Sequence, residues 1–68
     1  MKITVCGELC EENEGVTLKE VMEKYTPYGD EAVICVQNGN AHKSIDIPED
    51  LPVSEGDVID IVPLIIGG

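Results

Sequence analysis

The chain has 68 residues, 14 of them acidic and 4 basic, which gives a formal net charge of −10 at pH 7. A chain of this length buries only about 60% of the surface that its unfolded form exposes, which leaves little room for a deep enzyme pocket. The acidic excess argues against nucleic acid and anionic membranes as partners, because both are bound through Lys and Arg. It favours a partner with a basic face, although high charge also serves solubility alone.

The sequence carries no recognisable targeting or metal-binding motif. Its longest apolar runs, 32–36 and 61–66, are far shorter than the ~20 residues that cross a bilayer, and we expect a cytoplasmic location. An odd number of cysteines fits reduced thiols better than a disulfide framework. Cys6 and Cys10 lack zinc-site spacing and are predicted to flank a hairpin turn, whereas Cys35 is predicted to be a small core residue.

The first elements read as a hairpin. Residues 2–6 alternate, with Ile3 and Val5 predicted to point to the core face of a strand. Residues 7–8 follow as a turn, and residues 9–14 form a weaker, acidic strand. We expect this second strand at a sheet edge, where charged side chains discourage pairing with other chains.

A capping box predicts a helix that begins after Thr17, because the Thr17 and Glu20 side chains can each accept the other's backbone N–H. Glu20 and Lys24 are expected to pair one turn apart on the exposed side. Pro27 ends the helix, since the residue before a proline avoids the helical region. The side chains of the predicted buried stripe are Leu18, Val21, Met22 and Tyr25.

Three further strands are predicted. Residues 32–36 form a continuous apolar run, typical of a central strand that is covered on both faces. Asn38-Gly39 is a strong hairpin signal, and residues 40–47 are predicted as the more exposed return strand. Residues 48–57 read as loop and turn, and residues 58–62 as the last strand.

These elements predict the fold class. A helix with one apolar stripe must pack on one face of a sheet, which gives an α+β domain with a mixed sheet of four to five strands and one helix across one face. The first and last strands are both apolar, with Ile59 and Ile61 inward, and we expect both to be central. Residues 1–68 are predicted to form a single domain.

The end of the sequence is its most informative part. An apolar run leads through Pro63 into Gly67-Gly68, where folded domains usually finish in polar residues. Together with the helix after a first hairpin, the Asn38-Gly39 turn and the Gly56-Asp57 pair, this ending resembles the β-grasp, ubiquitin-like ThiS/MoaD family of sulfur carriers. The resemblance extends over essentially the whole chain and lies closer to the ThiS branch.

The resemblance implies a carrier and not an enzyme. It implies that the Gly68 carboxylate is adenylated by a ubiquitin-activating-type adenylyltransferase, which uses ATP, and that no cofactor is bound by the carrier itself. A sulfur donor such as a cysteine desulfurase then supplies sulfur for a thiocarboxylate, which a sulfur-accepting synthase consumes. Thiamine thiazole synthesis is the expected pathway. The alternatives are a molybdopterin or tungstopterin synthase small subunit, a ubiquitin-like modifier conjugated through Gly68, and an interaction domain with an idle diglycine.

The resemblance also assigns the site. Residues 64–68 are expected to form a flexible tail with Gly68 as the modified residue, and Gly67 is expected to thread a narrow channel because it lacks a Cβ. Leu64 would either contact the partner or extend the last strand into the core. No catalytic residue and no metal ligand is expected. The residues assigned to partner binding are Pro63, Leu64, Ile65 and Ile66.

Overall fold

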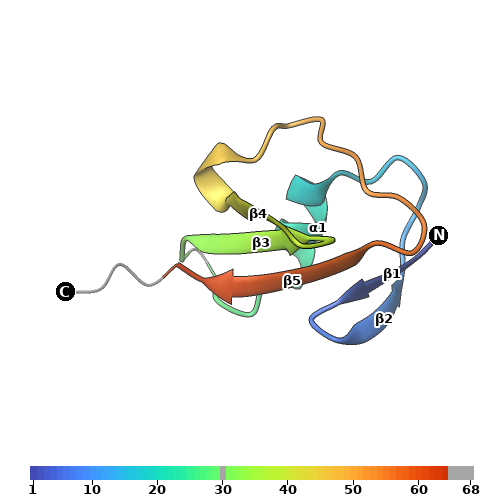
Figure 1. Ribbon diagram of the computed structural model, residues 1–68, viewed down its shortest axis with the longest axis horizontal. Helices are drawn as coiled ribbons and strands as arrows, with labels where there is room; N and C mark the ends of the chain where they lie inside the picture. The colour runs from blue at the N-terminus through green and yellow to red at the C-terminus, as the bar shows by residue number, and fades with distance from the viewer. Residues whose placement is uncertain (30, 65–68) are drawn as a thin grey trace.

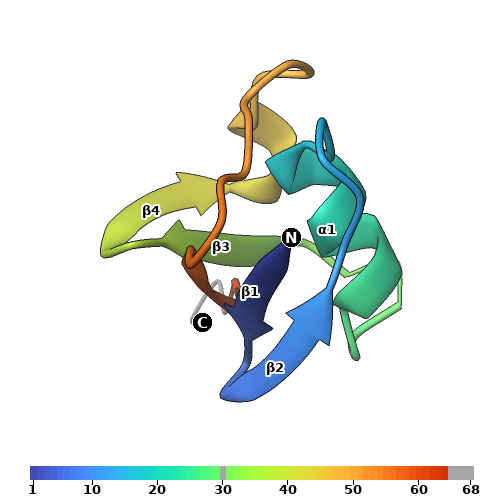
Figure 2. The same ribbon diagram turned by 90° about the vertical axis from the view of Figure 1, so that its right-hand side faces the viewer.

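The structure is a computed structural model that describes residues 1–29 and 31–64. Five strands form one sheet in the order β2-β1-β5-β3-β4, and helix α1 packs across one face of it (Figures 1 and 2). This two-layer arrangement confirms the predicted α+β class. The elements are β1 (Lys2–Val5), β2 (Glu8–Glu11), α1 (Leu18–Tyr25), β3 (Val33–Gln37), β4 (Asn40–Lys43), the 3-10 helix η1 (Ser44–Asp46) and β5 (Val58–Pro63).

The first and last strands lie side by side at the centre of the sheet, as expected. β1 and β5 run parallel, with Thr4 opposite Val58, and the Cys6 N–H donates to the Ile59 carbonyl at 2.9 Å. β5 also pairs antiparallel with β3, so both hydrogen-bonding edges of β5 are used over part of its length. The sheet is therefore mixed, and β5 is held from both sides before its last residues.

Helix α1 begins and ends where the sequence predicts. The Thr17 hydroxyl accepts from the Glu20 N–H at 3.2 Å, and a Glu20 carboxylate oxygen accepts from the Thr17 N–H at 3.1 Å. Thr26 is extended, with φ −62° and ψ 127°, directly before Pro27. The expected Glu20–Lys24 ion pair is not formed, because the cap occupies Glu20 and the Lys24 ammonium instead lies 2.8 Å from Glu12.

Glu12 ties the end of the first hairpin to the helix. Its carboxylate, whose side chain is 8% exposed, accepts from both the Lys24 ammonium and the Tyr25 hydroxyl. These two hydrogen bonds, Lys24 first, lower the pKa of Glu12. The contact fixes β2 against the C-terminal half of α1, where Tyr25 is only partly buried.

The core lies between α1 and the sheet. Cys35 is fully buried within it, as predicted, and burial raises the pKa of its thiol to about 11. At that pKa the thiol stays protonated near neutral pH and acts as a small apolar side chain. The buried core residues are Ile3, Val5, Leu18, Val21, Val33, Cys35, Ile47, Val53, Ile59 and Ile61.

Both hairpins are tight, but several predicted boundaries are wrong. The first turn falls on Cys6-Gly7, one residue earlier than predicted, with φ of 50° and 81°, and β2 ends at Glu11 instead of Glu14. The return strand β4 ends at Lys43, four residues short of the prediction, because the chain turns into η1. There the Ser44 hydroxyl accepts the Val33 N–H at 3.1 Å and closes the ladder.

The Asn38-Gly39 turn forms as predicted, with φ of 49° and 87°, and it is attached to the start of β5 through Asp57. The buried Asp57 carboxylate accepts from the side chains of Asn38 at 2.9 Å and Gln37 at 3.0 Å, and from the Ser54 N–H at 2.8 Å. Burial raises the pKa of Asp57, but these hydrogen bonds outweigh burial and leave the pKa below its ordinary value. The Gly-Asp pair of the sequence thus fixes where β5 begins.

Candidate functional site at the end of β5

The last backbone hydrogen bond at the end of β5 holds the chain just before its C-terminal residues. Pro63 lies opposite Val33, and the Leu64 N–H donates to the Ala32 carbonyl at 3.0 Å. In this antiparallel pair, Ala32 and Leu64 form a hydrogen-bonded position, so Pro63 and Val33 do not. Pro63 has no N–H to donate, and the sheet needs no donor at this position, because the pairing of β1 with β5 has already ended at Ile59.

Leu64 continues the ladder without entering the core. Its backbone bonds to Ala32, which agrees with the prediction that it extends the last strand. Its side chain is only half-buried and is not among the partly buried residues that pack against the core. Its backbone thus extends the strand, while its side chain remains open to a partner. The predicted site residues Ile65, Ile66, Gly67 and Gly68 lie outside the described residues, as does most of the expected tail.

The face of the sheet opposite α1 presents a strip of aliphatic side chains leading to this point. Ile34 lies directly across from Val62, and alternate residues of β3 and β5 continue the strip. Val58 is 48% exposed and Val62 42% exposed, while Ile34 and Val36 are half-buried. Asp60, opposite Val36, interrupts the strip on β5, but a largely apolar exposed surface of this kind marks interaction sites in soluble proteins. We call these residues, Ile34, Val36, Val58 and Val62, the open-face patch.

The open-face patch corrects one sequence interpretation. The continuous apolar run 32–36 suggested a strand covered on both faces, but only Val33 and Cys35 are buried under α1. Ile34 and Val36 point to the other face and are partly exposed. The signal was present, because a strand alternates its faces and the single predicted helix covers one of them. The sequence did not predict this surface: it assigned partner contacts to residues 63–66 and only a general steering role to the acidic residues.

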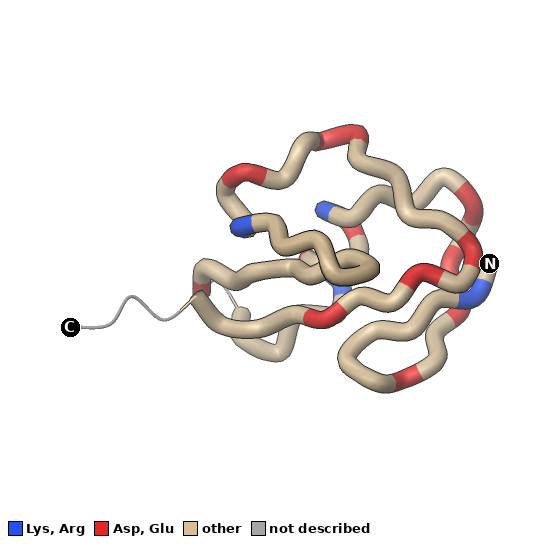
Figure 3. Tube along the Cα trace, viewed as in Figure 1, with Lys and Arg blue, Asp and Glu red and all other residues tan. Residues whose placement is uncertain are grey.

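One acidic and one basic residue lie next to the aliphatic side chains of the open-face patch. Asp60 lies between Val58 and Val62 on the exposed side of β5, and Lys43 is opposite Ile34 on β4. Figure 3 shows acidic residues spread over the loops and strand ends instead of collected in one cluster. This distribution suits long-range steering toward a basic surface more than recognition of a single cation.

The rest of the described chain offers little for other chemistry. Within residues 1–29 and 31–64, no three His, Cys, Asp or Glu side chains are grouped closely enough to hold a metal ion. None of the helices in the same ranges has the length and apolar character needed to span a membrane. The end of β5 and the open-face patch beside it are the surfaces that lead toward the C-terminal residues.

The order β1-β2-α1-β3-β4-β5, with parallel central strands and a helix across one face, defines a β-grasp protein of the ubiquitin-like class. The family model described as the ThiS family matches residues 2–68, and the chain belongs to that family. The match confirms the family resemblance seen in the sequence. No curated protein matches the chain.

Membership of this family defines the general role of the chain. ThiS-family proteins are small ubiquitin-like sulfur carriers and not enzymes. They act together with an activating enzyme and with proteins that accept the sulfur. We therefore interpret the end of β5 and the open-face patch as surfaces through which other proteins bind the carrier.

Proposed function

We propose that Gly68 is the residue that carries sulfur, and that the product made with it is the thiazole ring of thiamine. The observation that carries this proposal is the family match, which extends through Gly67-Gly68. The ladder supports it, because the Leu64–Ala32 hydrogen bond fixes the chain four residues before Gly68. The fold thus serves as a rigid holder for a short reactive segment.

The proposed chemistry needs only a carboxylate on this chain. A terminal carboxyl has a pKa of about 3.3–3.7, so at neutral pH it is an anionic oxygen nucleophile. Its oxygen attacks the α-phosphorus of ATP and pyrophosphate leaves, which forms an acyl-adenylate on the activating enzyme. The persulfide of a donor such as a cysteine desulfurase then displaces AMP to form an acyl disulfide. A second thiol, such as free cysteine in the reaction, cleaves the S–S bond, which releases the Gly68 thiocarboxylate and leaves a disulfide on the donor side. Gly67 and Gly68 have no Cβ to crowd the adenylate or the incoming sulfur nucleophile.

Docking is proposed to use two surfaces. The open-face patch supplies apolar area, at roughly 25 cal/mol for each Å² buried, next to the strand that leads to Gly68. Pro63, Leu64, Ile65 and Ile66 are proposed to contact the enzyme channel, and the half-buried Leu64 side chain remains available for this. The activating enzyme and the sulfur-accepting synthase would use this surface in turn.

Mass spectrometry of the C-terminus tests the proposal. The full chain is incubated with ATP, a ubiquitin-activating-type enzyme and a cysteine desulfurase with cysteine, and is then fragmented. We expect one sulfur in place of one oxygen, localised to Gly68. Oxidation of Cys or Met gives a similar mass gain, so a Cys6→Ser variant, which lacks the exposed thiol, is analysed in parallel.

Truncation and the accepting enzyme separate the alternatives. A chain lacking Gly67-Gly68 should remain folded but should not be adenylated, and adenylation of the truncated chain would contradict the proposal. Sulfur from the Gly68 thiocarboxylate should be consumed by a thiazole synthase. Consumption only by a molybdopterin synthase large subunit would move the chain to that pathway. Covalent adducts to protein lysines would indicate a modifier.

A further inference from the structure

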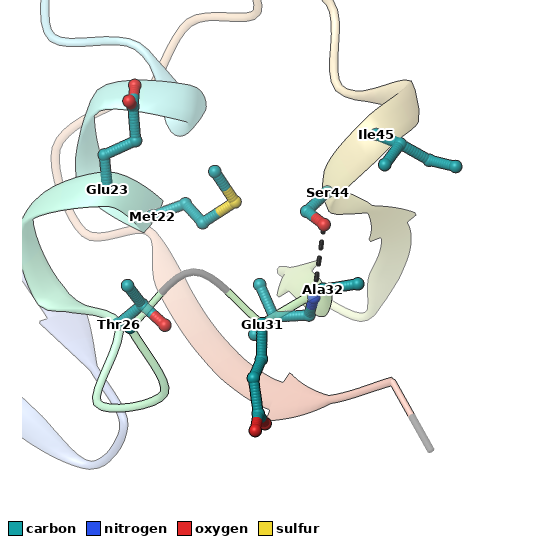
Figure 4. Close-up of a pocket in the computed structure, with 9 residues that line it drawn as sticks. Met22, Glu23, Thr26, Glu31, Ala32, Ser44 and Ile45 are labelled. Carbon is teal, nitrogen blue, oxygen red and sulfur yellow. Dashed lines mark hydrogen bonds between the residues drawn. The ribbon is translucent and has the colours of Figure 1, made fainter. Parts of the chain in front are cut away.

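A pocket of ≈ 420 Å³ opens beside the end of β5, between the C-terminal turn of α1 and η1. Its volume falls in the range of protein ligand pockets. The Met22 side chain points into it, and Ser44 and Ile45 of η1 stand on the opposite side (Figure 4). This pocket has no part in the chemistry proposed for Gly68.

The pocket has a mixed polar and apolar lining and carries two acidic residues at its margin. Met22 contributes apolar surface at the centre of the pocket, and Ile45, which is 79% exposed, lies at its outer edge. Glu23 and Glu31 also line the pocket, and their carboxylates lie on opposite sides of it, directed away from its centre (Figure 4). Among the described residues that line this pocket, none is basic.

The pocket reaches the residue that pairs with the chain just after β5, although no residue of β5 lines it. Ala32 lines it, and the carbonyl of the same residue accepts the Leu64 N–H at 3.0 Å. A protein that receives the residues after Leu64 must therefore come close to the rim of the pocket. The Val33 N–H donates to the Ser44 hydroxyl oxygen at 3.1 Å, so this backbone donor needs no partner from an occupant.

We propose that this pocket, which we call the helix-end pocket, is a second docking point for the activating enzyme. Its occupant is one large apolar side chain of the enzyme, flanked by a basic residue on each side. The apolar side chain would rest on Met22, and the basic residues would face Glu23 and Glu31. The inference rests on the proposed function only in the identity of the partner.

A peptide titration tests the helix-end pocket without the enzyme. The full chain, labelled at its methionine methyl groups, is titrated with a capped Arg-Leu-Arg tripeptide, and Met1 serves as an internal reference for Met22. We expect a saturable shift of the Met22 methyl signal. Capped Arg-Ser-Arg and Glu-Leu-Glu should bind more weakly, because each lacks one half of the required chemistry. Equal shifts with all three peptides, or none with Arg-Leu-Arg, would overturn the proposal.

A charge-matched pair of variants sharpens the test. Glu23→Lys with Glu31→Lys should weaken the peptide by about tenfold, since two attractive charges at exposed, screened positions become repulsive. Glu14→Lys with Asp50→Lys makes the same change in net charge at exposed positions outside the pocket, and should bind like the parent chain. Equal weakening in both pairs would show a general charge effect and overturn the pocket assignment.

The enzyme assay then separates the two proposals. We expect kcat/KM for adenylation to fall by about tenfold in the Glu23/Glu31 variant and to hold in the Glu14/Asp50 variant. If the parent chain is not adenylated at all, the proposed function fails, while the peptide titration still decides the pocket. If the parent chain is adenylated and both variants match it, the helix-end pocket is not a docking point for the enzyme.

Discussion

The two faces of the sheet are built from similar side chains but differ in their exposure to solvent. On β5, Ile61 is 3% exposed beneath α1, whereas its neighbour Val62 is 42% exposed on the other side. On β3, Val33 and Cys35 are buried while Ile34 and Val36 are only partly covered. The covered face stabilises the fold, and we infer that the open face stores apolar surface for a partner. Hydrophobicity alone does not distinguish these roles, since what matters is which face α1 occupies.

The largest expected effect tests this contrast directly. Ile61→Ala should lower the free energy of unfolding by about 2–4 kcal/mol, because it leaves a cavity in a packed core. Val62→Ala, one residue further along the same strand, should cost less than about 1 kcal/mol, because its side chain is already partly in water. Urea unfolding of both variants checks this. Equal losses would mean that the two faces are equivalent for stability.

The next effect concerns Asp57, which holds β5 to the second hairpin. Asp57→Asn should cost about 2 kcal/mol at pH 7, because it removes the charge that three hydrogen bonds stabilise. Asp60→Asn is the matched control on the exposed side of β5 and should change stability by under about 0.5 kcal/mol. Chemical denaturation of the two variants at pH 7 gives the comparison.

The comparison of Asp57→Asn with the parent chain also predicts how stability depends on pH. The pKa of Asp57 is lower in the folded chain than in the unfolded chain, so the native state binds fewer protons in the acidic range. Its contribution is present above the unfolded value of about 3.9 and is lost as pH falls through the folded value. The stability difference between the parent and Asp57→Asn should therefore shrink on acidification. A constant difference from neutral to strongly acidic pH would contradict the assignment.

Substitutions on the open face should weaken binding to the activating enzyme while leaving the stability of the fold almost unchanged. Ile34→Thr combined with Val62→Thr keeps β-branched side chains on paired strands but removes apolar area from the open-face patch. We expect affinity for the activating enzyme to fall about tenfold, with little loss of stability. Leu9→Thr, at a 70% exposed position on edge strand β2, is the control and should bind normally. Titration calorimetry measures both, and equal affinities would exclude the patch from docking.

The smallest effect is kinetic and concerns the acidic surface as a whole. With a net charge of −10, association with a basic partner should slow several-fold as salt is raised, while dissociation changes less. Stopped-flow measurement of both rate constants over a salt series checks this. Association rates that do not change with salt would mean that the acidic residues serve solubility and do not steer docking.

The sequence by itself determined the local elements of this protein. The Thr17–Glu20 capping box, the Pro27 stop and the Asn38-Gly39 turn depend on backbone geometry within a few residues, and all three form as predicted. The alternation of the first and last strands placed Ile3, Val5, Ile59 and Ile61 correctly in the core. The family could also be identified from sequence, because its ending lies in consecutive residues.

Only the tertiary structure decided which surfaces remain open. The end of β4 at Lys43 depends on the Ser44–Val33 hydrogen bond, and the partner of Lys24 is Glu12 on another element. The open-face patch and the helix-end pocket likewise combine residues that are far apart in the chain. Local propensity carries no information on such pairings, because they are set by the register of β3 with β5 and by the single face that α1 covers.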